Sequence, residues 1–348
     1  MAENKNFSAE YMKIRRYVLN RIHRAGGKGL QLPTAQELAK QFGCSRPTVS
    51  KAMKTLTEDG YVIGKPGIGS FINPSLEESQ KGNIIAGMPI IGIIFGDGML
   101  VHYEIFFGKL LSQILEQVIH RPAIVHIINL TTTNREKIIR EILAEDLDAL
   151  LWEGPVIEAD AIAELRAHGL PVISMKSAPS PGCDCVYFDM DTLGAEIAKR
   201  LLRKKRKNVV FLADRYPWNA AKKALVATFA EAGISLNEKL FLNSCSSSLE
   251  KLKEFLELGV PIDAVINPLF QIRHVIRVFD SLGFDRGKNC TLVNTGIYQE
   301  NLSPAGGILY ELPFREYVAA AVERVFQLIE NKNLEPVQIP IPVPISES

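Results

Sequence analysis

The first part of the chain alternates apolar and polar positions with the spacing of amphipathic helices. Between residues 8 and 24, apolar side chains recur every three or four positions, so they share one face of a helix. The arginines of this segment fall outside that face, and a glycine-rich run over residues 26–29 ends the predicted helix. The apolar positions are Tyr11, Ile14, Val18 and Ile22.

Two shorter helices follow, each with a clear start. Thr34 and Glu37 form a capping box, in which each side chain accepts a hydrogen bond from the other residue's backbone amide. This box predicts a helix over residues 35–42. Ser45 is placed to cap a third helix, and Pro47 falls in its first turn, where the missing N–H costs nothing.

A β-hairpin is predicted directly after the third helix. Two short apolar runs, residues 61–63 and 70–72, flank a glycine-rich turn. The tip of the hairpin carries Lys65 and little side-chain bulk, so its backbone can approach another molecule closely. Residues 1–72 are therefore expected to form a winged helix-turn-helix domain of α+β class.

The charge distribution along the chain indicates what kind of partner this domain binds. The 348 residues have a formal net charge of +1, yet residues 1–80 hold 12 Lys and Arg against 7 Asp and Glu. A basic front on an acidic body suggests a polyanionic partner. The N-terminal end of the third helix suits a phosphate, and Arg46 there can pair with guanine O6 and N7. The candidate DNA-binding residues are Thr34, Gln36, Ser45, Arg46, Pro47, Thr48, Ser50, Lys51, Lys65, Gly67 and Gly69.

These residues carry a resemblance to a known family. The segments that match are Leu32-Pro33-Thr34, Leu38-Ala39, Cys44-Ser45-Arg46-Pro47-Thr48-Val49, Leu56-Thr57-Glu58-Asp59-Gly60 and Gly67-Ile68-Gly69-Ser70-Phe71-Ile72. Residues 11–72 resemble the GntR-type winged helix, which implies binding to double-stranded DNA. Two positions depart from the family pattern: many members carry Arg where Ser50 stands, and often Arg or Glu at Gln36.

A linker is predicted over residues 73–87, and from residue 88 short apolar runs alternate with amphipathic stretches. Strand–helix alternation implies parallel sheets covered by helices, and this length suits two α/β lobes. The predicted strands are 90–95, 124–128, 149–151, 172–175, 186–188, 209–212, 264–266 and 291–294. The predicted helices are 103–119, 134–144, 160–168, 193–202, 220–232, 248–258, 272–282 and 314–329. The lobes are expected at 88–190 plus 310–333 and at 191–309, within a domain spanning 88–348.

Candidate ligand-binding residues follow from this topology. Ligands of such folds sit outside the carboxyl ends of the strands. Aromatic side chains beside carboxylates and amides, which a sugar needs, stand at those positions. The candidates are Asp97, His102, Tyr103, Trp152, Glu153, Lys176, Asp189, Trp218, Asn267 and Thr295.

The body resembles the LacI/GalR effector domain, which is similar to periplasmic sugar-binding proteins. The matching segments are Ile91-Gly92-Ile93-Ile94, Leu147-Asp148-Ala149-Leu150-Leu151, Gly169-Leu170-Pro171-Val172-Ile173, Val186-Tyr187-Phe188-Asp189 and Ala230-Glu231-Ala232-Gly233-Ile234. The resemblance implies a small-molecule effector bound between two lobes. Ala221 stands where the family often has a ligand-binding Arg, and Asn267-Pro268 replaces an Asn-Asp pair.

Other function classes find little support. The sequence contains no G-x-S-x-G, P-loop or H-E-x-x-H motif, so we expect neither an enzyme nor a bound metal or cofactor. Five cysteines without paired metal-ligand spacing fit reduced thiols, and a polar N-terminus without an apolar core fits a cytoplasmic protein rather than a secreted one.

The sequence therefore predicts a ligand-controlled transcriptional regulator. We expect a homodimer, bound to a pseudo-palindromic operator, that acts as a repressor relieved by a sugar-like ligand. One alternative is a DNA-binding regulator with a vestigial pocket that is controlled by a protein partner. Another is a solute-binding protein, which would share the body but would need export and no basic head.

Overall fold

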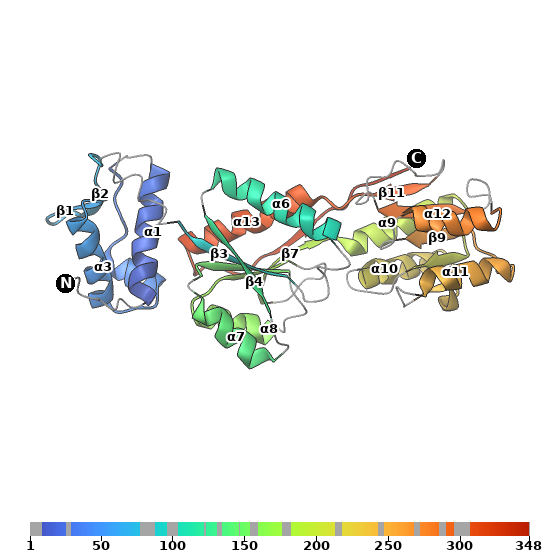
Figure 1. Cartoon of the computed structure of the whole chain (residues 1–348), viewed down its shortest axis with the longest axis horizontal. Coiled ribbons are helices and arrows are strands. Elements are labelled where there is room, and N and C mark those ends of the chain that lie inside the picture. The colour runs from blue at the N-terminus through green and yellow to red at the C-terminus, as the bar shows by residue number, and fades with distance from the viewer. Residues whose placement is uncertain are drawn as a thin grey trace.

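The molecule consists of three parts in a row (Figure 1): an N-terminal head, a first lobe built on six strands and a second lobe built on five strands. The head comprises residues 9–76. The computed structural model describes residues 9–25, 29–76, 88–95, 104–121, 123–130, 134–145, 147–153, 159–175, 182–212, 218–242, 247–267, 272–284, 290–295 and 307–347.

The head has its own apolar core. Its elements are α1 (Ala9–Ala25), α2 (Ala35–Gln41), α3 (Arg46–Glu58), β1 (Val62–Lys65) and β2 (Gly69–Ile72). The stripe predicted on the first helix lies in this core, with Ile14 and Val18 fully buried. Both predicted caps are present: the Thr34–Glu37 capping box starts α2, and the Ser45 side chain accepts from the Thr48 amide at the start of α3.

The first lobe is a parallel sheet with two helices on each face. Its strands are β3 (Ile90–Phe95), β4 (Ile124–Asn129), β5 (Ala149–Glu153), β6 (Val172–Met175), β7 (Asp184–Phe188) and β12 (Gln338–Ile341), in the order β12-β7-β6-β5-β3-β4. Helices α6 (Glu104–His120) and α13 (Phe314–Glu330) pack on one face. Helices α7 (Arg135–Ala144) and α8 (Ala159–Ala167) pack on the other.

The second lobe repeats this plan with five strands. They are β8 (Val209–Phe211), β9 (Ala264–Asn267), β10 (Thr291–Thr295), β11 (Ile308–Tyr310) and β13 (Ile345–Glu347), in the order β13-β11-β10-β9-β8, with only β13 antiparallel to its neighbour. Helices α9 (Met190–Arg203) and α10 (Trp218–Glu231) cover one face. Helices α11 (Ser248–Glu257) and α12 (Ile272–Ser281) cover the other, beside the short 3₁₀ turn Glu238–Leu240.

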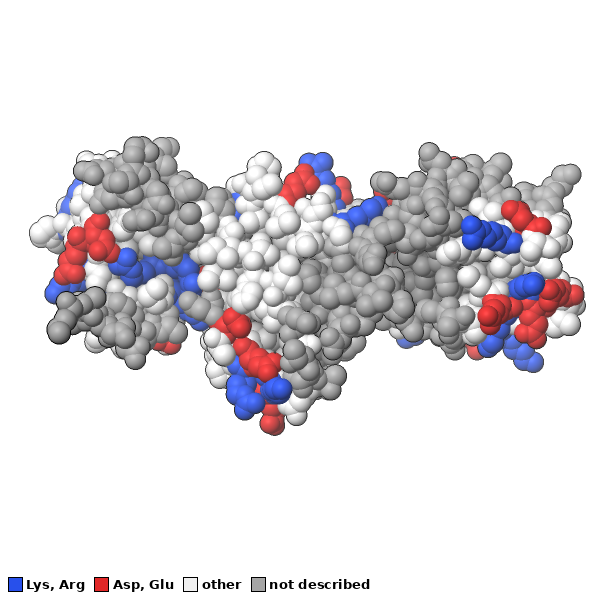
Figure 2. Space-filling model, in the orientation of Figure 1, with Lys and Arg blue, Asp and Glu red and all other residues white. Residues whose placement is uncertain are grey.

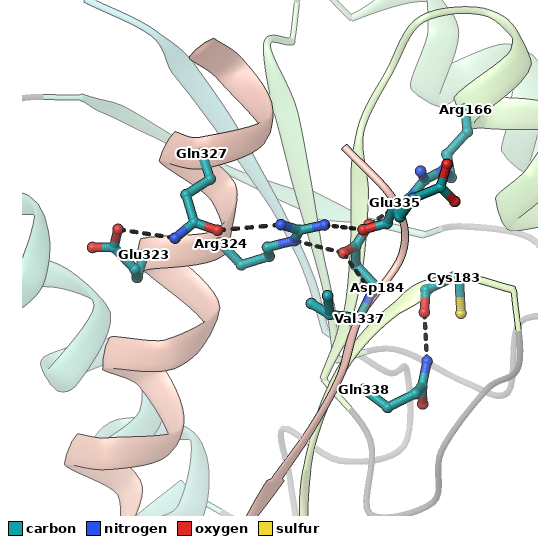
Figure 3. Close-up of polar contacts among 9 residues, drawn as sticks. All are labelled: Arg166, Cys183, Asp184, Glu323, Arg324, Gln327, Glu335, Val337 and Gln338. Atoms are coloured by element: carbon teal, nitrogen blue, oxygen red, sulfur yellow. Dashed lines mark hydrogen bonds and ion pairs between the residues drawn. The ribbon is translucent and has the colours of Figure 1, made fainter. Parts of the chain in front are cut away.

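A buried carboxylate anchors the C-terminal part of the chain to the first lobe (Figure 3). Asp184 is completely buried, and its Oδ1 accepts hydrogen bonds from Arg324 Nε at 2.6 Å and from the Val337 amide at 3.2 Å. Its Oδ2 pairs with Arg166 of α8. Because each charge of this group has a partner, α8, β7, α13 and the approach to β12 are held together.

The predicted strands and helices all correspond to elements of the structure, and the two-lobed parallel fold predicted for the body is confirmed. The strands β11, β12 and β13 were not predicted. The domain boundaries remain a prediction, although the first residues of the predicted linker pack on the head, where Leu76 is buried in the core. Within the described residues, no helix has both the length and the apolar character needed to cross a membrane.

Candidate nucleic-acid interface and ligand site

The N-terminal end of α3 is an exposed polar surface. Arg46, Pro47 and Ser50 are exposed there, and Thr48 is half-buried. Within the described part of the chain, the Arg46 guanidinium makes no hydrogen bond or ion pair. A rigid helix end thus presents the Arg46 guanidinium at the positive end of the helix dipole, and a guanidinium so placed can bind phosphate or guanine.

The side-chain oxygens of the capping residues in the head form hydrogen bonds with neighbouring residues of the same helix start. The Thr34 amide donates to Glu37 Oε2 at 2.7 Å, and the Glu37 amide donates to Thr34 Oγ1 at 3.2 Å. Hydrogen bonds from the Thr34 amide and hydroxyl lower the pKa of the Glu37 carboxyl. Ser45 Oγ lies 2.9 Å from Thr48 Oγ1. Thr34 and Ser45 therefore set the helix starts, while the exposed Gln36 side chain stays available.

The two predicted lysines lie on aromatic rings of the head. Lys65 Nζ lies 4.6 Å from the centre of the Phe71 ring on the hairpin, and Lys51 Nζ lies 5.9 Å from the Tyr11 ring. Both lysines are exposed. The ring restrains each lysine at an exposed position of the head, so less side-chain freedom is left to lose when the lysine meets a phosphate.

The hairpin is stiffened by a third segment that the sequence reasoning missed. Gln31 Nε2 donates to the Ile68 carbonyl at 3.0 Å, and residues 30–32 exchange backbone hydrogen bonds with β2. The tip is a turn with Pro66 at its second position and Gly67 at φ +72, as a type II turn requires. Gln31 therefore supports the turn that carries Lys65.

Helix α1 holds α3 in place through polar contacts. Tyr11 Oη lies 2.7 Å from Thr55 Oγ1, and Arg15 Nη1 donates to the same hydroxyl at 3.0 Å. Arg15 Nη2 also pairs with Asp59 at 2.8 Å. All candidate DNA-binding residues lie on the head, and their roles remain predictions.

At the carboxyl edge of the first sheet, a buried carboxylate lies among aromatic rings. Glu153 ends β5, and its Oε2 accepts a hydrogen bond from Tyr317 Oη of α13 at 3.0 Å. The Phe188 ring stacks on Tyr317 with centroids 4.3 Å apart and meets Phe314 edge-on. We call Glu153, Phe188, Phe314 and Tyr317 the first-lobe cluster. Only Glu153 was a sequence candidate.

The corresponding edge of the second sheet carries an amide pair and an aromatic pair. Asn267 Nδ2 donates to Asn294 Oδ1 at 2.7 Å, and both residues are buried. Trp218, at the start of α10, packs against Tyr310 with centroids 5.5 Å apart. We call these four residues the second-lobe cluster. Sequence reasoning named Asn267 and Trp218 and missed their partners, which come from other strands.

The other ligand candidates have different surroundings. Trp152 is 1% exposed and packs in the apolar core beneath α7 and α8. Asp189 caps α9, where its Oδ1 accepts from the Thr192 amide at 3.0 Å. Thr295 ends β10. Asp97, His102, Tyr103 and Lys176 lie outside the described residues, as does Pro268. A binding role for each remains a prediction.

Ala221 belongs to a close helix crossing. Its backbone lies against Gly194 of α9, and its side chain is buried. The position therefore serves the packing of α9 on α10. Within the described residues, no group of three or more His, Cys, Asp or Glu side chains has the arrangement of a metal site, and Cys44, Cys183, Cys185 and Cys290 are thiols rather than disulfides.

Two family models match the chain. The model of bacterial regulatory proteins of the gntR family matches residues 11–72, within the head. The model of periplasmic binding proteins and the sugar binding domain of the LacI family matches residues 106–267. The two matches fall on the two parts of the chain that the sequence analysis compared with these families.

Known proteins resemble the chain in two different ways. The histidine utilization repressor of Klebsiella aerogenes is 32% identical over 63 residues, which cover 18% of this chain and 26% of that protein. In four curated relatives of this kind, the matched segment makes up between 13% and 26% of the relative's length.

Solved structures match over most of the chain. A transcriptional regulator CelR–cellobiose complex superposes with a TM-score of 0.62 at 14% identity, over 90% of this chain and 98% of that chain. A dimeric Lac repressor superposes with a TM-score of 0.61 at 15% identity, over 74% of this chain and 97% of that chain. At this identity the likeness establishes the fold.

Proposed function

We propose that this chain is a transcriptional regulator. Its head is a DNA-binding domain of the bacterial gntR family, and its body has the LacI-type periplasmic-binding fold. The head binds a specific DNA operator, and a small polar ligand between the two lobes controls the affinity. DNA lies in the cytoplasm of a bacterium, so the proposal includes a cytoplasmic location.

The exposed end of α3 carries this proposal. Arg46 extends from its first turn without a partner among the described residues, and Ser50 stands one turn further along on an exposed position. In a helix-turn-helix, the N-terminal residues of the second helix contact base edges in the major groove. Lys65 on the hairpin supplies a phosphate contact beside it.

Selection from a random pool of duplexes tests the DNA part of the proposal. The purified full-length protein is expected to enrich one sequence motif, with two copies related by two-fold symmetry. Duplexes that are retained without any shared motif would contradict sequence-specific binding.

We also propose that the ligand is a sugar or a sugar-like molecule. A ring hydroxyl needs paired donors and acceptors, and a ring face needs an aromatic surface. The second-lobe cluster offers both, and Glu153 in the first-lobe cluster adds a carboxylate. A sugar is also supported by the cellobiose bound in the CelR complex and by the sugar-binding description of the matching family model. The candidate residues remain Asp97, His102, Tyr103, Trp152, Glu153, Lys176, Asp189, Trp218, Asn267 and Thr295.

A melting-temperature screen of the full-length protein tests the ligand. The panel contains pentoses, hexoses, deoxysugars, uronic acids, disaccharides and nucleosides. A ligand present at 100 times its Kd stabilises the folded state by about 2.7 kcal/mol. One sugar class is expected to raise the melting temperature, and a panel without any shift would contradict the sugar proposal. We propose that the protein represses transcription by occluding a promoter, and that this sugar relieves the repression.

We propose a homodimer formed through the first lobe. Large apolar side chains are exposed on α6 and on the edge strand β4: Leu115, Ile119, Ile124 and Ile127 are 46%, 76%, 40% and 51% exposed. In Figure 2 a white surface lies on the middle part of the molecule, between charged side chains above it and below it. An apolar surface of this kind marks a contact with another protein. The Lac repressor that superposes on this chain is dimeric, which supports a second copy of the chain as that other protein.

Sedimentation velocity tests the dimer. The wild-type protein should sediment as a dimer at micromolar concentration, and Ile127→Glu should give monomers. Leu258→Glu is the matched control, because Leu258 is 70% exposed in the second lobe. A monomeric wild-type protein would contradict the proposal.

A further inference from the structure

The head is docked on the first lobe by a shielded ion pair. Arg16 of α1 places its Nε 3.2 Å from Asp148 Oδ2, and the two side chains are 9% and 12% exposed. The same oxygen of Asp148 accepts a hydrogen bond from the Ile90 amide at 2.8 Å. Arg16 is thus tied to the start of β3, and breaking a pair removed from water leaves a charge without its partner.

A second contact joins the head to the end of α13. Gln41, the last residue of α2, donates through Nε2 to the carbonyl oxygens of Ile329 at 3.4 Å and Glu330 at 3.0 Å. The last carbonyls of a helix have no partner within it, so the head caps α13. Just beyond, Lys332 Nζ lies 5.5 Å from the centre of the Phe42 ring. These residues, with Arg16 and Asp148, form what we call the docking face.

The other end of α13 belongs to the first-lobe cluster. Phe314 begins the helix, and Tyr317 binds Glu153 within its first turn. Seventeen residues of α-helix span about 25 Å. Midway along, Arg324 is anchored to the buried Asp184 (Figure 3). One close-packed helix therefore runs from the candidate ligand site to the head.

Docking leaves the DNA-binding surface of the head open. The contacts to the lobe come from α1 and from the C-terminal end of α2. In Figure 1, α1 lies on the side of the head that faces the first lobe, and the hairpin of β1 and β2 lies on the far side. Arg46, Ser50 and Lys65 remain exposed. A docked head thus has a fixed direction and a free recognition surface.

We propose that the docking face transmits the state of the ligand site to the DNA-binding head, and that the docked arrangement is the operator-binding one. This inference rests on the proposed function. A ligand that shifts Glu153 and Tyr317 displaces α13, whose far end Gln41 caps. In a dimer, two docked heads are held at a fixed distance and can bind two half-sites only at one spacing. Released heads are no longer held at that distance.

The spacing between half-sites provides the test. The Kd of the full-length protein is measured for its selected operator and for the same operator with five base pairs inserted between the half-sites. Five base pairs rotate one half-site by about half a helical turn. The variants are Asp148→Asn, which leaves the head unchanged, and Gln41→Ala. Lys40→Ala is the control, because Lys40 is exposed next to Gln41 and has no contact with the lobe among the described residues.

The wild type and Lys40→Ala are expected to bind the lengthened operator at least about tenfold more weakly, because only one docked head can engage. In Asp148→Asn and Gln41→Ala, this ratio should fall below about threefold. Using a ratio cancels any change in general affinity for DNA. A wild-type protein without the spacing penalty, or variants that keep it in full, would overturn the inference.

Hydrogen exchange measured without DNA tests the docking of the head separately from the proposed DNA-binding function. Peptides from α2 and from the last turn of α13 should exchange faster in Asp148→Asn and Gln41→Ala than in the wild type and Lys40→Ala. Unchanged exchange in both variants would overturn the docking inference by itself. Failure of the wild type to bind any selected duplex would instead overturn the proposed function.

Discussion

Gly194 and Ala221 meet at the crossing of α9 and α10, where a Cβ atom on Gly194 would lie 2.0 Å from the Ala221 carbonyl oxygen. No side chain larger than hydrogen fits at this distance, and the obstacle is backbone. The crossing thus fixes how the first helix of the second lobe lies against the next one.

Gly194→Ala should therefore destabilise the protein by about 1–3 kcal/mol or more, because the two helices must move apart. Chemical denaturation of the full-length protein measures the loss. Gly108→Ala is the matched control: it is also helical, nothing lies within 4 Å of its Cβ, and the change should be neutral or stabilising by about 0.5–1 kcal/mol. Equal stability of the two variants would refute this account of the crossing.

Lys65→Ala should weaken binding to every duplex by a similar factor. Lys65 lies over Phe71 on the hairpin and is placed for a phosphate, which carries no sequence information. The dependence of log Kd on log salt concentration should lose about one unit of slope. Fluorescence anisotropy over a salt series measures this, and a loss confined to the selected operator would make Lys65 a base contact instead.

Trp218→Phe should reduce the melting-temperature rise produced by whichever sugar stabilises the wild type. Phe keeps an aromatic contact with Tyr310 but offers a smaller face and no indole N–H. The melting temperature without sugar is expected to fall as well, because Trp218 is 4% exposed and the smaller ring leaves a cavity, so the sugar response is measured from each protein's own baseline. An undiminished response at the same sugar concentration would remove Trp218 from the ligand site.

The stability of the protein should contain a contribution from Lys332 that depends on pH. Burial, reinforced by the nearby Lys13, lowers the pKa of Lys332 from 10.5 to about 8. Between these two values the unfolded chain holds more protons than the folded protein, so the free energy of unfolding rises with pH. Relative to low pH, where the buried Lys332 must carry a charge, the protein gains stability as the pH rises. This gain is complete above pH 10.5 and is lost as the pH falls through about 8.

Lys332→Met removes this titration. The difference in unfolding free energy between wild type and variant should shift in favour of the wild type by about 1–3 kcal/mol from pH 7 to pH 10.5. Denaturation curves of both proteins at several pH values give this difference. A constant difference across the range would show that Lys332 titrates alike in the folded and unfolded states.

The helix starts that place the candidate DNA-binding residues could be predicted because their determinants are local in sequence. The capping box of Thr34 and Glu37 and the cap at Ser45 set two helix starts, and these starts place Arg46. Gln31 escaped prediction because its contact with Ile68 joins segments 37 residues apart. Strands β12 and β13 escaped because prolines interrupt that segment, and prolines are tolerated in strands at the edges of sheets.

The partners within the candidate ligand site could not be predicted from local sequence patterns. Glu153 and Tyr317 are 164 residues apart, and Asn267 and Asn294 are 27 apart, so no local pattern links the members of either pair. The helical pattern places Arg16 outside the apolar face of its helix, where a charge is expected to meet solvent. The structure buries it, because the head packs on the first lobe and supplies Asp148 as its partner.

The central claim is tested most directly by the ratio of two dissociation constants, for a scrambled duplex and for the selected operator. We predict a large ratio for the wild type and a loss of about 1–3 kcal/mol of this discrimination in Arg46→Ala, where a guanine contact disappears. Lys54→Ala, which removes an exposed positive charge from the same helix, should keep the ratio. A wild-type protein that binds both duplexes equally, or an Arg46→Ala variant that loses affinity for both alike, would contradict the account.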